Sequence, residues 1–135
     1  MADEASIIEL FNGGRPMAFT CAEANTIPKG TITEMATSAD RTVNAATNAN
    51  YPIMGIAAFE KIGGDGSTSI SVYTDGIFDV TIGAGARNAG VWYANSAATN
   101  IMETAAAEDW LNGSVIGYGI EDTAGSDKIA MRVNK

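Results

Sequence analysis

The stretch that decides the fold, residues 51–82, reads YPIMGIAAFEKIGGDGSTSISVYTDGIFDVTI. Its first part, residues 53–59, is apolar at nearly every position. That pattern is typical of a strand buried on both faces, although a short helical segment shares it. Gly55 and the Tyr-Pro pair before it favour the strand. The glycine-rich residues 63–67 then predict a turn.

After this turn, apolar and polar side chains alternate. Ile70 and Val72 alternate with polar neighbours, and residues 78–82 repeat the pattern, so each run has one apolar face at the period of a β-strand. The Asp75-Gly76 pair between them is either a two-residue hairpin turn or a glycine kink inside one long strand. We expect the kink, because small barrels bend their strands at such points.

Composition limits the class of protein. The chain has 135 residues, of which 46% are hydrophobic and 18% charged, which predicts one domain with a real core. Sixteen acids and eight bases give a net charge of −8, which argues against nucleic acid as a partner because nothing here would neutralise phosphates. No basic start precedes a long apolar run, so we expect neither a signal peptide nor a membrane span.

Few side chains suggest catalysis or metal binding. Histidine is absent, and the single cysteine, Cys21, excludes an internal disulfide. Neighbouring acids such as Glu108 and Asp109 do not face each other, so we interpret them as solvated surface and predict no catalytic residue, metal or cofactor. A calcium site at Asp65 to Ser67 with Asp127 lacks the twelve-residue ligand loop. A carboxylate-based hydrolase or lyase is a remote alternative.

The N-terminal residues 1–15 differ from the rest of the chain. We treat them as an arm, separate from a single domain at residues 16–135. The segment is too short to be helical alone in water. It is either a frayed terminus or an arm whose apolar side chains dock on another subunit. The candidate interface residues of this arm are Ile7, Ile8, Leu10 and Phe11.

The remaining chain predicts further strands, a long loop and one helix. Strands are expected at residues 16–22, 31–35, 90–94, 114–120 and 128–133, and a loop at residues 36–50. Residues 101–111 contain good helix formers, with Asn100 as the expected N-cap and Gly113 as the stop. We expect Trp110 and Leu111 to anchor this helix to the barrel and to contribute to an interface.

The sequence also contains an internal repeat. Residues 16–74 and 76–134 each read as strand, glycine turn, strand, insertion, a buried strand centred on glycine, turn and strand. Gly55 and Gly117 occupy matching positions, where two strands can approach closely. Neither half has enough apolar strand to close a core alone, so we expect the two halves together to form one small closed β-barrel.

This layout resembles the head decoration, or capsid cement, proteins of tailed phages and related viruses. The resemblance is carried by PIMGIA at residues 52–57, GDGS at 64–67, ISVYTDGIF at 70–78, VIGYGIED at 115–122 and KIAMRV at 128–133. It covers residue 16 to the end, and the acidic insertion around Trp110 departs from the usual pattern. The resemblance implies an all-β barrel of the β-tulip type, commonly a homotrimer. It implies a virion protein, made in the host cytoplasm, that binds the major capsid protein on the outer capsid surface and has no catalytic residues.

One alternative function remains open. Trp92 and Tyr93 on a strand, with Tyr118, could line a site that stacks a sugar ring or holds a peptide. The protein would then be a small binding module instead of a structural protein. Such aromatic residues are more often core or subunit interface.

Overall fold

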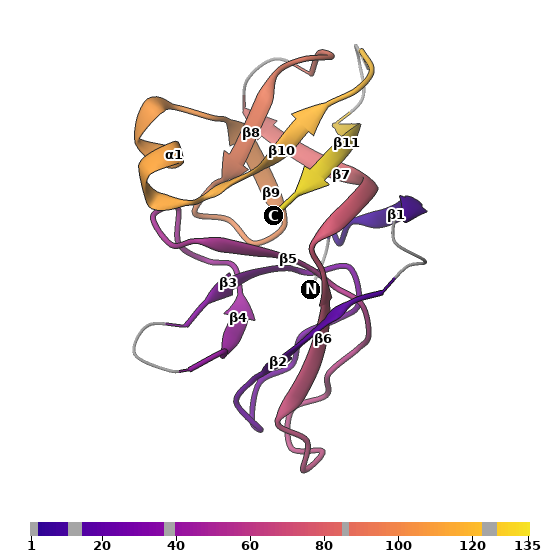
Figure 1. Ribbon diagram of the computed structural model, residues 1–135, viewed down its shortest axis with the longest axis vertical. Helices are drawn as coiled ribbons and strands as arrows, with labels where there is room; N and C mark the ends of the chain where they lie inside the picture. The colour runs from indigo at the N-terminus through magenta and orange to yellow at the C-terminus, as the bar shows by residue number, and fades with distance from the viewer. Residues whose placement is uncertain (1–2, 11–14, 37–39, 85–86, 123–126) are drawn as a thin grey trace.

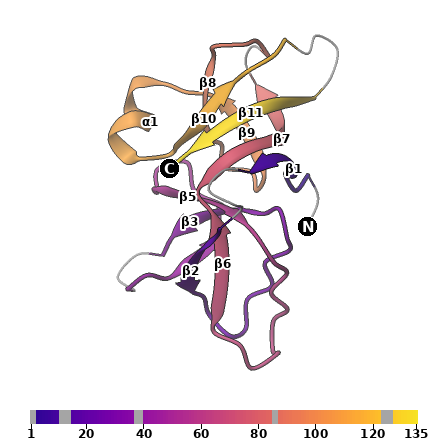
Figure 2. The same ribbon diagram turned by 45° about the vertical axis from the view of Figure 1, so that its right-hand side comes forward.

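The computed structural model describes residues 3–10, 15–36, 40–84, 87–122 and 127–135. Within these ranges the chain is all-β apart from one short helix, as the sequence predicts. The strands form two sheets, which lie one above the other along the long axis of the molecule (Figures 1 and 2). Strands from residues 17–73 build the lower sheet, and strands from residues 75–134 build the upper one together with the first strand.

The lower sheet is antiparallel, in the order β2-β6-β5-β3-β4. Its strands are β2 (Met17–Thr20), β3 (Ile32–Met35), β4 (Val43–Ala45), β5 (Ile53–Ala57) and β6 (Ser69–Tyr73). A single parallel bridge between Thr20 and Thr42 brings the end of β2 next to the start of β4. The expected loop at residues 36–50 therefore contains a strand that its polar composition did not predict.

The upper sheet has the order β1-β7-β11-β10-β8-β9. Its strands are β1 (Ser6–Leu10), β7 (Asp75–Ala84), β8 (Trp92–Asn95), β9 (Ile101–Thr104), β10 (Val115–Gly119) and β11 (Lys128–Asn134). Strand β9 also pairs in parallel with β7, so β7, β11, β10, β8 and β9 close into a five-stranded barrel.

The closed barrel is therefore built differently from the prediction. Its five strands all come from the second half of the chain, whereas both halves were expected to contribute. The physical reason lies in the core. One cluster joins barrel residues such as Val80 and Met131 to Ile32, Ile53 and Ile56 of the lower sheet. The lower sheet thus supplies apolar side chains to the core without adding strands to the barrel.

A second cluster fills the lower sheet itself. It contains only first-half residues: Phe19, Cys21, Ile27, Val43, Ala57, Ile70 and Val72. The alternation of Ile70 and Val72 with exposed or half-buried neighbours agrees with the period expected of a strand. Cys21 is a free, buried thiol whose pKa is raised by burial.

The chain passes between the sheets at the predicted kink. Strand β6 belongs to the lower sheet and β7 to the upper, with only Thr74 between them, so Asp75-Gly76 is not a hairpin turn. Gly76 has a φ of +146°, and a β-carbon there would lie 2.9 Å from the Glu9 carbonyl oxygen. Glycine is therefore required both by the backbone conformation and by the close approach of β1.

Matching positions in the two halves make matching backbone contacts. The Gly30 amide donates to the Ala57 carbonyl at 2.9 Å, and the Gly90 amide donates to the Gly119 carbonyl at 2.8 Å. Both glycines adopt the left-handed backbone conformation, with φ of +87° and +79°. In β5 and β10, a β-carbon at Gly55 or Gly117 would overlap the carbonyl group of the neighbouring strand. The order β2-β6-β5-β3-β4 also corresponds, element by element, to β7-β11-β10-β8-β9.

Candidate interaction surfaces

The helix α1 (Ala107–Asn112) is shorter than expected and begins later. The Ala106 amide donates to Asp109 Oδ2 at 2.7 Å, and Ser114 Oγ donates to Asp109 Oδ1 at 3.1 Å, so one carboxylate closes both ends of the turn. Gly113 ends the helix in a left-handed conformation, as predicted. A six-residue helix is not stable alone, so these contacts and tertiary packing hold it.

The expected N-cap, Asn100, has a different role. Asn100 is buried with a φ of +65°, and its Oδ1 accepts the Ile32 amide at 2.9 Å. Residues after it enter β9, because pairing with β7 and β8 outweighs their helix propensity. The side chain that was expected to cap a helix instead joins the two sheets.

Three aromatic side chains meet on the outside of the barrel; we call Trp92, Trp110 and Tyr118 the aromatic cluster. Trp92 and Tyr118 are directly opposite each other on β8 and β10, with ring centroids 4.9 Å apart. Trp110 on α1 packs edge-on against Trp92, also at 4.9 Å. Trp92 is 40% exposed and Trp110 53% exposed. The cluster therefore attaches the helix to the barrel and still presents aromatic surface to solvent.

The neighbouring Leu111 does not anchor the helix. It is 89% exposed, whereas Trp110 contacts the barrel through Trp92. The prediction that both residues anchor the helix is therefore right for Trp110 and wrong for Leu111. A leucine so exposed beside a partly exposed aromatic cluster is typical of a surface that binds a partner.

The predicted N-terminal arm is partly a strand. β1 pairs with β7 of the same chain, where Ile7 is opposite Phe78 and Leu10 is opposite Gly76. Ile7 and Ile8 are 41% and 54% exposed, while Leu10 packs partly against the core. Residues 6–10 are thus neither frayed nor separate from the barrel. Phe11 lies outside the described residues.

Strand β1 is an edge strand of the upper sheet. Among the described strands it pairs with β7 alone, so its other edge has no strand beside it. An edge strand with exposed isoleucines is a template for pairing with another chain. The interface role of Ile7, Ile8 and Leu10 stays a prediction, now carried by an edge strand.

The structure places Tyr93 away from Trp92 and Tyr118, the other two residues expected in a sugar site. Trp92 and Tyr118 lie together, but Tyr93 is fully buried in the core, where its hydroxyl accepts the Asn88 amide at 3.3 Å. Successive residues of a strand point to opposite faces, so Trp92 and Tyr93 cannot line one site. A cleft of about 500 Å³ lies elsewhere, between Glu4, Lys29 and Ile56.

The buried carboxylate of Glu34 is hydrogen-bonded to backbone amides of a neighbouring loop. Its side chain is 4% exposed, and Oε2 accepts the amides of Thr47 and Asn48 at 3.3 and 3.2 Å. Burial raises the pKa of this carboxyl, and the two amide hydrogen bonds oppose the rise. Glu34 thereby holds the loop before β5, whose Asn48 carbonyl accepts a hydrogen bond from Asn95 of the barrel.

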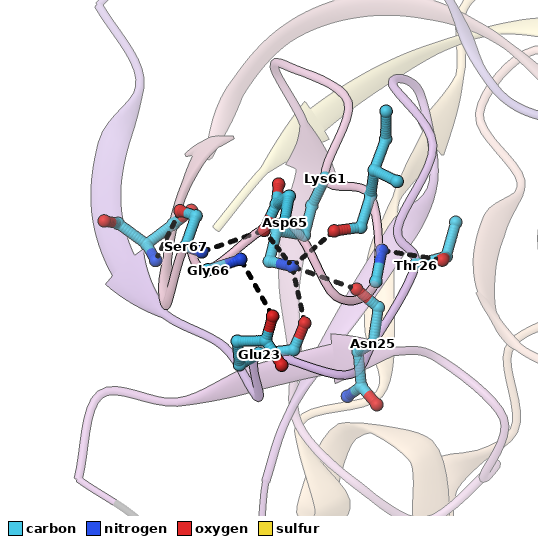
Figure 3. A network of polar contacts seen from close by, with 10 residues as sticks. Glu23, Asn25, Thr26, Lys61, Asp65, Gly66 and Ser67 are labelled. Atoms are coloured by element: carbon cyan, nitrogen blue, oxygen red, sulfur yellow. Dashed lines mark hydrogen bonds and ion pairs between the residues drawn. The ribbon is translucent and has the colours of Figure 1, made fainter.

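A buried lysine, Lys61, is the main polar feature that the sequence did not reveal (Figure 3). It is 2% exposed, and Nζ lies 2.8 Å from the carbonyl oxygens of Glu23 and Ile62 and 2.9 Å from Asp65 Oδ1. The hydrogen bond from Lys61 holds the pKa of Asp65 below its ordinary value. The only sequence signal is the spacing of Lys61 and Asp65, which is common and weak.

This arrangement bears on the weighed calcium site. Asp65 Oδ1 accepts a hydrogen bond from the Lys61 ammonium, so a lysine already lies where a cation would have bound. In the described ranges of the chain, no group of three or more acidic, cysteine or histidine side chains is placed to hold a metal ion.

Comparison with known proteins leaves the class of this chain open. No family model matches it, and no curated protein is similar to it. Among the described residues, no helix has the length and apolar character needed to cross a lipid bilayer. The functional argument therefore depends on the surfaces described above.

Proposed function

We propose that this protein is a structural, non-enzymatic capsid decoration protein. It binds the outside of an icosahedral viral head where major capsid subunits meet, and it stabilises the shell. The observation that carries the proposal is the exposure of large apolar side chains on ordered structure, at Ile7 and Ile8 of β1 and at Trp110 and Leu111 of α1. Such surfaces suit adhesion to another protein.

The proposed mechanism is multivalent adhesion. A homotrimer would present three copies of each surface, and simultaneous contacts raise the effective concentration of every further contact. The partners are the major capsid protein and further copies of this chain on the outer surface of the virion. The net charge of −8 makes nucleic acid an unfavourable partner.

We also propose that the two sheets are two copies of one unit, together giving a β-tulip-like architecture. Three features support this interpretation: the same strand order in both sheets, the left-handed glycines at 30 and 90, and the close strand contacts at Gly55 and Gly117. Superposition of residues 16–74 on residues 76–134 tests it directly, because matching strands must coincide in space and direction.

The functional test uses shells assembled from the major capsid protein of the virus whose genome encodes this chain, which the proposal names as its partner. We expect the protein to bind these shells and to raise the temperature at which they break, measured by light scattering. Ile8→Ser and Leu111→Ser should weaken binding without unfolding the protein, because both side chains are exposed. Met17→Ser, at an exposed methionine where β2 begins, is the matched control. Shells that break at the same temperature with and without the protein would refute the proposal.

A second candidate function is a binding module for a carbohydrate or peptide. The partly exposed aromatic cluster favours it, because exposed rings can stack on sugars. Both tryptophans of the chain belong to this cluster, so tryptophan fluorescence reports on it alone. Titration with a panel of oligosaccharides should change the emission if this function is correct. Unchanged emission together with shell binding would leave the decoration role.

A further inference from the structure

The outer face of the barrel carries a row of side chains across β8, β10, β11 and β7, which belong to the upper part of the molecule (Figures 1 and 2). Trp92 on β8 is directly opposite Tyr118 on β10. Tyr118 is in turn opposite Arg132 on β11, and Arg132 is opposite Ile77 on β7. Directly opposite residues of antiparallel strands point to the same side of a sheet. We call these four residues the outer row.

An ion pair continues the outer row beyond its aromatic side chains. Arg132 Nε and Nη2 lie 3.1 and 3.0 Å from Asp75 Oδ1, and both side chains are 30% exposed. Asp75 and Ile77 alternate along β7 and therefore share the outer face. The pair thus places a charged donor and a charged acceptor within reach of solvent, next to Tyr118, without adding net charge.

Aromatic rings followed by a paired guanidinium and carboxylate match the chemistry of a sugar chain. A pyranose ring has an apolar face of C–H groups, which packs on aromatic rings, and hydroxyl groups at its edge, which both donate and accept hydrogen bonds. Neighbouring strands lie about 4.8 Å apart, so the outer row spans roughly 10 Å from Trp92 to Arg132. A disaccharide has this length, so stacking and hydrogen bonding fall on successive sugar units.

The closed barrel disfavours a peptide at the same place. Among the described strands, β8, β10, β11 and β7 each have a hydrogen-bonded strand on both sides. Their backbone groups bond to one another, so a peptide cannot add to them as a further strand. A peptide lying on the rings would leave its own backbone groups without partners, which costs free energy. A sugar avoids this cost, because its polar groups lie at its edge.

Charge favours a neutral sugar. The positive charge of Arg132 is balanced by Asp75, so the pair offers no excess charge to an ionic ligand. The whole chain has a net charge of −8, which repels sugars that carry carboxylate or sulfate groups.

We propose that the outer row is a binding site for a neutral disaccharide or longer oligosaccharide. Trp92 and Tyr118 stack on one sugar unit, and the pair of Arg132 and Asp75 bonds the hydroxyl groups of the next and determines which sugar binds. This inference goes beyond the decoration role. It rests on the second candidate function, to which it gives a ligand class and two further residues.

The experiment titrates the full chain with cellobiose, maltose, lactose and diacetylchitobiose by isothermal titration calorimetry, each beside its monosaccharide units. We expect one disaccharide to bind several-fold more tightly than its monosaccharides. Arg132→Met should weaken this binding by about tenfold, the loss expected for a hydrogen bond to a charged group. Arg41→Met, at an arginine that bonds within the lower sheet, is the control and should bind within about twofold of the parent.

The outcomes separate this inference from the functions on which the protein is tested. Equal affinity of the parent and Arg132→Met would overturn the inference, and the second candidate function would stand. Binding of acidic oligosaccharides or peptides alone would overturn it in the same way. Binding of no sugar or peptide would overturn the second candidate function as well, whereas the decoration role is decided by shell binding.

A second variant keeps the test decisive if Arg132→Met does not fold, as checked by circular dichroism. Trp92→Phe keeps an aromatic ring on β8 but offers a smaller face, so binding of the disaccharide should weaken several-fold. Unchanged affinity of this variant would place the sugar away from the outer row and overturn the inference.

Discussion

The lower and upper sheets share one strand order but close to different extents. In the upper sheet, β7 and β9 pair over several residues, and the barrel is closed. In the lower sheet, β2 and the start of β4 share one isolated bridge, between Thr20 and Thr42, and side-chain hydrogen bonds from Thr20 and Arg41 add to it. The longer β7 accounts for the difference, because it offers ten residues where β2 offers four. The extra length lets β7 pair with β9 at one end and with β1 at the other.

The two halves also differ in what their loops present. The first half uses its loop after β5 to bury a lysine and expose Phe59 and Ile62. The second half uses its insertion before β10 to form α1 and the aromatic cluster. In each half, a segment between two strands adds large exposed apolar side chains to those that the strands themselves carry. The predictions below test this comparison, beginning with the largest expected effect.

Substitution of the matching central glycines should destabilise both halves. In Gly55→Ala and Gly117→Ala the new methyl overlaps a carbonyl of the adjacent strand, so each should lower the free energy of unfolding by about 3 kcal/mol. Gly64→Ala is the control, because its site is open and only its φ of +81° is unfavourable, at about 1 kcal/mol. Urea unfolding measures all three. A loss below that of the control at either position would show that the two close contacts are not equivalent.

Removal of the buried ammonium should affect only the first half strongly. Lys61→Met removes the ammonium that bonds to the Glu23 and Ile62 carbonyls and to Asp65, and we expect a loss of about 2 kcal/mol in the free energy of unfolding. Lys29→Met is the matched control at an exposed lysine, with an expected change within about 0.5 kcal/mol. Equal stability of the two variants in urea would mean that the hydrogen bonds of the Lys61 ammonium contribute little to stability.

Loss of the aromatic contact should loosen α1 and leave the barrel intact. Trp110→Ala removes the edge-on contact with Trp92, with an expected cost of about 1 kcal/mol. Leu111→Ala, one residue further on and almost fully exposed, should change stability by less than about 0.5 kcal/mol. Thermal unfolding followed by far-ultraviolet circular dichroism measures both. The reverse order of effects would mean that Leu111 anchors the helix.

The smallest effects should appear in the pH dependence of stability, with opposite signs for two carboxyls. The pKa of Asp65 is lowered by Lys61, so its contribution is present above its ordinary pKa and is lost as pH falls through the lowered value. The pKa of Glu34 is raised by burial, so its contribution is greatest below its ordinary pKa and is lost as pH rises through the raised value.

Two neutral variants separate these contributions. Asp65→Asn should remove part of the loss of stability in acid, and Glu34→Gln should remove part of the loss toward neutral pH. Urea midpoints measured between pH 3 and pH 7 check both. A Glu34→Gln curve parallel to that of the parent would show that Glu34 ionises without cost in the folded protein.

Local pattern was enough to predict several elements. The alternation at residues 70–72 and 78–82 predicted β6 and much of β7, because a half-buried strand needs one apolar face regardless of what covers it. Gly76 and Gly113 predicted a kink and a helix end, since both positions require a backbone that other residues rarely adopt. The all-β class followed from the same signals.

Other features depended on partners far away in the chain. Residues 101–104 favour a helix by composition but form β9 because β7 and β8 lie beside them. Residues 6–10 carry no strand alternation but pair with β7, and the ammonium of buried Lys61 is bonded to carbonyl oxygens of a distant loop as well as to its own loop.

The sequence by itself therefore determined the strands with one apolar face and the glycine bends, because each follows from the residues of a short segment. Only the tertiary structure decided that one half closes into a barrel, that Tyr93 is core while Trp92 is surface cluster, and that a lysine holds a loop. Those outcomes depend on hydrogen bonds and packing between distant residues, and no local pattern contains that information.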